Sequence, residues 1–330
     1  MTKHCRSAVL TAAFAGAVTL LAGCGSGSTA DSSSTSTGAG VTSVKVGTSP
    51  TLTNASLYLA MEDGTFTEHK LKATPQVVNS GAQALPLLLN GQIQFTAADP
   101  MGAINAIKQK MPVKIVGQGS VNTSDPAKDT TVLVVGSDQI KKPSDLSGRT
   151  VAVNALGGLA QIAAQAAIDV KGGDSEGVRF VEMSFTQMVA AVESGKVDGA
   201  VLNEPFVSQA RAAGLRDLMP VMSTTIPTVP NIVYLTSESY AKSHPEVVKE
   251  FAASLDEANA TLGSDPEKVR QVAQKSTTTG ADVLAKIILP TFPDKPLKRT
   301  PLDSLQTLMV KYDALDAKID LAPYLLTAQS

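Results

Sequence analysis

The sequence predicts an α/β protein built of two lobes. Seven short runs rich in Val and Ile alternate with helix-like segments, and continuous apolar strands of this kind indicate parallel sheets covered by helices on both faces. About 290 residues follow position 43, which is long for a single hydrophobic core and natural for two. Twice a strand-like run ends in an acid followed by proline, at Asp99 and at Glu204.

The first 23 residues have the pattern of an export signal. Lys3 and Arg6 precede the uncharged residues 7–22, a stretch too short for a comfortable membrane span. The sequence "LAGC" at 21–24 resembles the lipobox of bacterial lipoproteins, which implies cleavage before Cys24 and a lipid on its thiol. Because the other cysteine, Cys5, would be removed, Cys24 would be a lone thiol in an exported protein, and lipidation would explain it. The alternative is an ordinary signal peptide with a free cysteine.

A flexible tether is expected next. Residues 25–40 consist of Gly, Ser, Thr and Ala apart from Asp31, a composition that forms no core and whose reach is roughly 20–25 Å. Residues 24–43 are therefore predicted to be a lipidated cysteine and linker that hold the body on the extracytoplasmic face of the cell membrane. Cleavage removes two basic and no acidic residues and so changes the formal net charge from −2 to −4, which gives no indication of nucleic-acid binding.

Helix starts and stops alternate with the expected strands. Gly91 and Gly195 end helix-like segments as left-handed stops. Asp99 and Glu204 are expected to cap new helices, with proline at the first helical position. Ligands bind where the parallel strands of an open sheet end, so two such edges facing each other would form a cleft. The expected strands are residues 44–47, 93–97, 113–117, 132–136, 150–154, 178–182 and 199–202.

The last third of the chain is predicted to be mostly helical. Helices are expected from His244 and from Asp265, because each precedes a proline and an early glutamate. A chain that leaves the first lobe near residue 131 and returns near residue 235 would bring these helices back to that lobe. The predicted division is therefore 44–131 with 235–330 for lobe 1, and 132–234 for lobe 2.

Four stretches together resemble the periplasmic substrate-binding proteins of the nitrate, sulfonate and taurine family, which also includes binding proteins for the pyrimidine precursor of thiamine. They are "SGAQALPLLLNGQIQFTAADPMGAINAIKQKMPVKIVGQGS", "QIKKPSDLSGRTVAVNALGG", "AAVESGKVDGAVLNEPFVSQA" and "HPEVVKEFAASLDEA". The resemblance runs from about Val44 to Lys275 and is specific through order and spacing. It implies a two-lobed type II periplasmic-binding-protein fold with two interlobe crossovers. It also implies a monomer that traps a small solute by hinge closure and delivers it to an ABC permease and its ATPase.

Candidate ligand groups lie where the expected strands end. Small residues open helices at "SGAQAL" and "ALGGLAQ", where free amides and the helix dipole suit an oxyanion; the alternative is a plain glycine turn. Polar side chains after the first and third expected strands could face the cleft or only form local turns. The acids could cap helices, contact ligand, or do both. The expected ligand-binding residues are Ser49, Asn54, Ser80, Gln83, Asp99, Gln118, Ser120, Asn154, Gly157, Gly158, Asn203 and Glu204.

The charges of these loops favour one kind of solute. None of the loops contains Lys or Arg, so amides and dipoles would hold an anionic group, and Asp99 and Glu204 would favour a solute that also carries an amine. An aminosulfonate such as taurine, or an aminopyrimidine, fits better than nitrate.

Enzyme chemistry is not expected. Beyond the export signal the sequence contains only two histidines, His69 and His244. The common motifs for a catalytic nucleophile, a metal site or a phosphate-binding loop are missing from it. We therefore expect no catalytic residue, metal or cofactor. The alternatives are a cleft enzyme of the same fold, pyrimidine-synthase-like or lyase-like, that uses two carboxylates, and a cell-surface sensory receptor.

Overall fold

A computed structural model describes residues 40–49, 51–78, 81–277 and 280–326. The expected export signal, Cys24, most of the linker and Ser80 lie outside these residues, so the predictions about them stay predictions. Within the described part of the chain, no helix combines the length and apolar character needed to cross a membrane.

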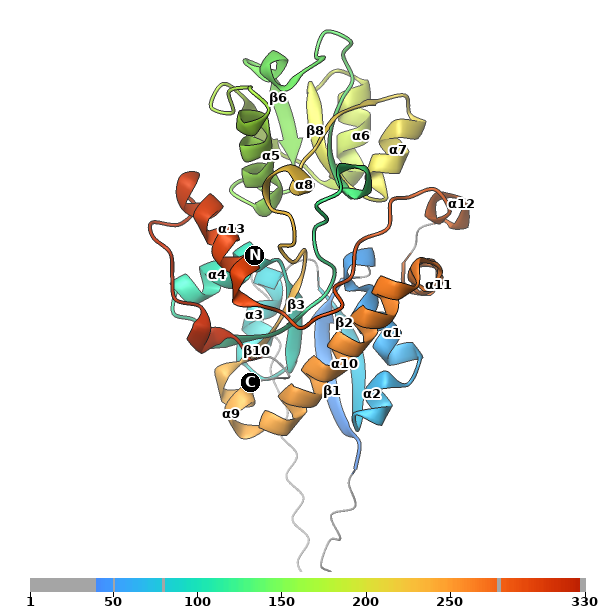
Figure 1. The fold of residues 1–330 in the computed structure, drawn as a ribbon, viewed down its shortest axis with the longest axis vertical. Helices are drawn as coiled ribbons and strands as arrows, with labels where there is room; N and C mark the ends of the chain where they lie inside the picture. The colour runs from blue at the N-terminus through green and yellow to red at the C-terminus, as the bar shows by residue number, and fades with distance from the viewer. Residues whose placement is uncertain (1–39, 50, 79–80, 278–279, 327–330) are drawn as a thin grey trace, which may run out of the picture. The chain divides into compact units, whose positions relative to one another are not determined.

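The first sheet has five strands in the order β2-β1-β3-β10-β4 (Figure 1). Strand β1 pairs in parallel with β2 and β3, whereas β10 is antiparallel to both of its neighbours. The bounds are β1 (Thr42–Thr48), β2 (Leu71–Val77), β3 (Phe95–Ala98), β4 (Val113–Gln118) and β10 (Val233–Ser237).

The second sheet also has five strands, in the order β7-β6-β8-β5-β9. Strand β6 pairs in parallel with β7 and β8, whereas β5 is antiparallel to β8 and β9. The bounds are β5 (Thr131–Val135), β6 (Thr150–Val153), β7 (Arg179–Glu182), β8 (Gly199–Asn203) and β9 (Arg216–Pro220).

The chain crosses between the sheets twice, after β4 and after β9. The expectation of wholly parallel sheets is wrong, because each sheet contains one interior strand that runs backwards. Strands β5 and β10 are the first strands after a crossover. Each enters its sheet at the edge where the parallel strands end: Thr131 pairs with Asn203, and Val233 pairs with Ala98. A strand that enters at that edge must run opposite to its neighbours.

Helices flank both sheets (Figure 1). The expected left-handed stops are confirmed at Gly91 and Gly195, whose φ angles are 73° and 68°. Asp265 caps its helix as expected by accepting hydrogen bonds from the amides of Glu267 and Lys268, both at 3.1 Å. The bounds are α1 (Ala55–Glu62), α2 (Thr65–Glu68), α3 (Gly81–Leu89), α4 (Pro100–Lys108), α5 (Leu159–Val170), α6 (Phe185–Glu193), α7 (Phe206–Ala212), α8 (Met222–Thr225), α9 (Glu238–Ser243), α10 (Pro245–Ser264), α11 (Pro266–Ser276), α12 (Ala281–Leu284) and α13 (Arg299–Lys311).

The hydrophobic core joins α10 to the first sheet and α13 to both sheets. Phe251 of α10 stacks on Phe95 of β3 with ring centroids 3.8 Å apart. Leu305 of α13 is fully buried in a cluster that includes side chains of both α4 and α5. Next to α13, the Tyr312 hydroxyl donates to Asp169 of α5 at 2.6 Å. The C-terminal helix, which the sequence placed with lobe 1, thus also contacts a helix of the second sheet.

Candidate functional site

The strand ends of both sheets line one cavity of about 450 Å³, a volume within the range of small-molecule sites. Segments after β1 and β3 supply one side, segments after β6 and β8 supply the other, and both crossovers contribute. The lining residues are Thr51, Leu52, Thr53, Asp99, Thr130, Thr131, Asn154, Ala155, Gly158, Leu159, Ala160, Phe185, Asn203, Glu204, Pro205, Phe206, Met222, Asn231, Ile232, Thr277 and Pro290. We call this cavity the cleft.

Asp99 is the free acid of the cleft. It follows β3 and is the N-cap of α4, as the sequence predicts: one carboxylate oxygen accepts from the amide of Gly102 at 2.8 Å, and Pro100 stands in the first turn. Desolvation by the surrounding protein raises the pKa of Asp99 above its usual value, although the residue is exposed, while hydrogen bonds from backbone N–H groups including those of Gly102 and Met101 lower it. Within the described residues Asp99 has no ion-pair partner, so its charge is uncompensated.

Gly102 lets the Asp99 carboxylate lie close to α4. A Cβ atom at position 102 would lie 2.8 Å from Oδ2 of Asp99, closer than van der Waals contact permits. An alanine at this position would force the carboxylate to move, so the position of the carboxylate depends on the glycine.

Glu204 is held by the protein. Its side chain is only 3% exposed. It accepts hydrogen bonds from the amide and hydroxyl of Ser208, at 3.1 and 3.0 Å, and from the amide of Ile288, at 3.2 Å. Arg211 lies 3.8 Å away and compensates its charge. The prediction that Glu204 is the N-cap is wrong by one position, since Pro205 is the N-cap of α7, but the carboxylate does bind a first-turn amide.

The second sheet presents hydrogen-bond donors to the cleft. Gly158 is the N-cap of α5 and provides no side-chain cap, and the first two helical residues line the cavity. Free amides and the positive end of the dipole lie there. Asn203 accepts from the Thr131 hydroxyl at 3.0 Å, and its NH₂ group has no partner among the residues described. The cleft thus combines an acceptor from the first sheet, Asp99, with donors from the second, the first amides of α5 and the NH₂ group of Asn203.

Aromatic and apolar side chains supply much of the remaining wall. Phe185 and Phe206 are stacked, with centroids 5.5 Å apart and planes 15° from parallel. Both line the cleft, together with Leu52, Met222 and Ile232. The sequence analysis missed these residues, although Phe206 directly follows the acid–Pro pair that marked the site.

Several predicted site residues lie elsewhere. Asn54 is fully buried: it donates to the carbonyl of Ser49 and to the Thr51 hydroxyl and accepts from Tyr234, so it fixes the turn before α1. The hydroxyl of Ser120, also fully buried, accepts from Asn231.

Four more of the twelve predicted residues are not part of the cleft lining, namely Ser49, Gln83, Gln118 and Gly157. Gln118 lines a different cavity, and the Gly157 amide donates to Gln161. Gln83 is exposed and, like Ser49 and Gly157, is not part of the cleft lining.

The cleft has an acidic character. No Lys, Arg or His is among its lining residues. Because Arg211 compensates Glu204, the net charge that faces a ligand comes from Asp99.

Comparisons with known proteins agree with this architecture. The family described as NMT1/THI5 like matches residues 52–269. The taurine-binding periplasmic protein of Escherichia coli (strain K12) is 26% identical over 235 residues, which cover 68% of this chain and 71% of that protein.

Two solved structures share the fold. The alkanesulfonate-binding protein SsuA from Xanthomonas axonopodis pv. citri, bound to MOPS, has a TM-score of 0.69 at 19% identity, covering 88% of this chain and 99% of that chain. The periplasmic nitrate-binding protein NrtA from Synechocystis PCC 6803 has a TM-score of 0.67 at 14% identity, covering 85% and 84%. The predicted two-lobed periplasmic-binding fold is confirmed.

Proposed function

The chain belongs to the NMT1/THI5-like family, and we propose that it is the extracytoplasmic solute-binding component of an ABC importer. One observation carries the proposal: a cavity of about 450 Å³ lies between the strand ends of two sheets that two crossovers connect. The named relatives that bind taurine, alkanesulfonate and nitrate support it. In this role the protein traps a solute in the cleft and delivers it to a permease and its ATPase.

Hinge closure has a physical basis in the crossovers. On one side of the hinge they pair with each other: the Thr228 amide donates to the carbonyl of Asn122, and the Asn122 amide donates to the carbonyl of Val229, both at 2.9 Å. On the other side Asp129, 2% exposed, accepts from the amide and hydroxyl of Ser223 at 2.7 and 2.8 Å. Most residues of the intervening segment 123–128 are exposed. We propose that bending occurs there and in the facing segment 224–227.

The solute we propose carries a hydrogen-bond donor at one end and an anionic or acceptor group at the other. Asp99 would bind an amine or N–H group, and the start of α5 with the Asn203 amide would bind an oxyanion. The stacked Phe185 and Phe206 would contact its apolar part. An aminosulfonate such as taurine or an aminopyrimidine meets these demands, whereas nitrate offers no donor for Asp99.

We further propose that Cys24 carries a lipid that anchors the protein, as a monomer, to the extracytoplasmic face of the cell membrane. The basis is the "LAGC" sequence after an apolar stretch and the Ser-rich linker that follows. Mass spectrometry of the protein isolated from its own cells tests this: a diacylglyceryl adduct at an N-terminal Cys24 is expected, and an unmodified Cys24 would contradict it.

A binding screen tests the transport function. Thermal-shift measurements with taurine, alkanesulfonates, aminopyrimidines and nitrate should show stabilisation by one donor-bearing solute, because a ligand that binds only the folded state raises Tm. Calorimetry should then give one site per chain, and the bound solute should be recovered unchanged. Recovery of a chemically altered product would favour the enzyme alternative, and tight nitrate binding would exclude the proposed solute class.

A further inference from the structure

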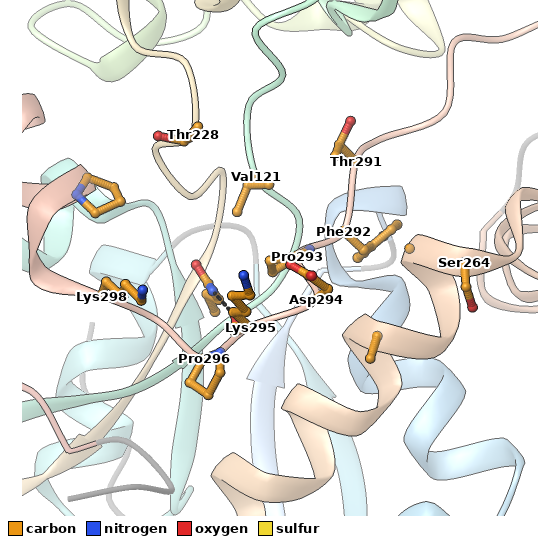
Figure 2. A pocket seen from close by; sticks show the side chains of 14 residues that line it. Val121, Thr228, Ser264, Thr291, Phe292, Pro293, Asp294, Lys295, Pro296 and Lys298 are labelled. Atoms are coloured by element: carbon orange, nitrogen blue, oxygen red, sulfur yellow. Dashed lines mark hydrogen bonds between the residues drawn. The ribbon is translucent and has the colours of Figure 1, made fainter.

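A second cavity, of about 570 Å³, shares no lining residue with the cleft. Figure 2 shows the side chains that line it. Both crossovers line it through Val121 and Thr228, and the C-terminal end of α10 lines it through Ala260, Gly263 and Ser264. The remaining wall comes mainly from residues 291–298, which we call the strap, and from the end of β4. We call this space the hinge cavity.

Backbone contacts hold the walls of the hinge cavity in place. The Val121 amide donates to the carbonyl of Thr291 at 2.8 Å. The side-chain amide of Gln118, which is 5% exposed, donates to the carbonyl of Lys295 at 3.0 Å. A Cβ atom on Gly263 would lie 2.8 Å from the carbonyl oxygen of Phe292, so the strap packs directly on α10.

The hinge cavity offers two cations and an apolar wall. Lys295 and Lys298 both line it, and across the described parts of the chain neither ammonium group has an ion-pair or hydrogen-bond partner. Figure 2 shows the side chains of Lys295 and Lys298 among those that line the cavity, together with Pro296. Asp294 is the one acid in the lining, so the lining carries a net positive charge, in contrast to the cleft. Val121, Phe292, Pro293, Pro296 and Pro301 supply apolar surface.

We propose that the hinge cavity is a second binding site, for a small organic anion with an apolar body, of the aromatic carboxylate class. The two lysines pair with the carboxylate, and the ring packs against Phe292 and the prolines of the strap. This site is independent of the cleft, because it uses different residues and selects the opposite charge.

The test uses 2-naphthoate as the probe on the full chain, with methyl NMR as the site-specific readout. The methyl groups of Val121 and Ala260 should shift in a saturable manner with a Kd below about 1 mM, the affinity expected for a ligand of this size. The neutral isostere 2-naphthamide should bind about fivefold more weakly, because it lacks the charge that two exposed lysines attract.

Two variants separate charge from shape. The double change Lys295→Gln and Lys298→Gln should weaken naphthoate binding about fivefold, whereas Lys72→Gln with Lys242→Gln, on β2 and α9, should leave it unchanged. Ala260→Phe fills the cavity at an exposed helical position without changing charge, and it should weaken binding more than tenfold. Should that variant fail to fold, the lysine pair, which is exposed, still decides the question.

The proposal is overturned if the Val121 and Ala260 methyl groups do not shift. It is also overturned if naphthoate and naphthamide bind equally, or if the double lysine variant binds as tightly as its control. Because the readout is at the hinge cavity, failure of the cleft to bind any solute would leave these results unaffected.

Discussion

The substitution Asp99→Asn separates helix capping from ligand binding. Asparagine caps helices about as well as aspartate, and the raised pKa of Asp99 means that its ionised form does not stabilise the fold. The free energy of unfolding at neutral pH, measured by urea denaturation, should therefore not fall. A hydrogen bond from a ligand amine contributes about 1.5–3 kcal/mol to a carboxylate and about 0.5–1.5 kcal/mol to the amide oxygen of asparagine. The difference of about 1–1.5 kcal/mol should raise the Kd of an amine-bearing solute about 5- to 10-fold, measured by calorimetry. The other acid that lines the cleft, Glu204, is paired with Arg211, so it cannot take over the role of Asp99 toward a ligand amine.

Two further variants at the same position test the geometry. Asp99→Ala removes the hydrogen bond to the Gly102 amide and should cost about 1 kcal/mol of stability as well as affinity. Gly102→Ala keeps the charge but places a Cβ atom 2.8 Å from the present position of Oδ2. The carboxylate must then move, so affinity should fall although the protein still carries Asp99.

The pH dependence of binding gives an independent check on Asp99. Desolvation by the surrounding protein raises its pKa above the usual value, although the residue is exposed, so protonation on acidification begins at a higher pH than for an ordinary aspartate. Affinity for an amine-bearing solute should therefore fall as the pH is lowered through that raised pKa, whereas the Asn variant should show no such loss. If Asp99→Asn binds within twofold of the wild type at neutral pH, Asp99 only caps α4 and the reasoning is refuted.

Three other substitutions test the surrounding structure by urea denaturation. Burial raises the pKa of Asp256 to about 6, so its ionised form destabilises the folded state. Asp256→Asn should raise the free energy of unfolding by about 1–3 kcal/mol at pH 8 and by almost nothing at pH 3. Equal effects at the two pH values would contradict this. Partial burial lowers the pKa of His69, but two glutamates of α10 outweigh it and raise the pKa. The ion pairs of His69 therefore stabilise the fold below the pKa that His69 has in the unfolded chain, and this stabilisation is lost as the pH rises through its higher pKa in the folded protein. His69→Gln should thus lower the free energy of unfolding more at pH 5.5 than at pH 9. Tyr312→Phe removes the bond to Asp169 and should cost about 1–3 kcal/mol; an unchanged midpoint would show that α13 does not depend on it.

Two of the three strands that were not predicted from the sequence share a physical reason. Strands β2 and β9 each contain a proline, Pro75 and Pro220, and both lie at sheet edges. Proline is tolerated at an edge because its missing N–H can face away from the sheet, yet the same proline masks the strand in the sequence. The other interior strands, β1, β3, β5, β6 and β8, were predicted near their observed bounds, whereas β10, which contains no proline, was also missed.

Capping chemistry was predictable because it is local. Asp99 and Asp265 bind amides two or three residues ahead, and the residue types and the following proline are visible in any short window of sequence. The same window shows the glycines whose positive φ angles end α3 and α6. A short window of sequence does not show which side chains form hydrogen bonds with residues far away in the chain.

Glu204 and Gln118 show the consequence for site prediction. Both follow or end strands at the expected edge, and from the sequence both could have faced a ligand. The Glu204 carboxylate also accepts from Ile288, 84 positions later, and the Gln118 amide donates to Lys295, 177 positions later. Both partners lie after α12, beyond the stretch from about Val44 to Lys275 that carries the family resemblance. The C-terminal segment thus decides which polar groups remain available to ligands, and the strand-end pattern alone does not contain that information.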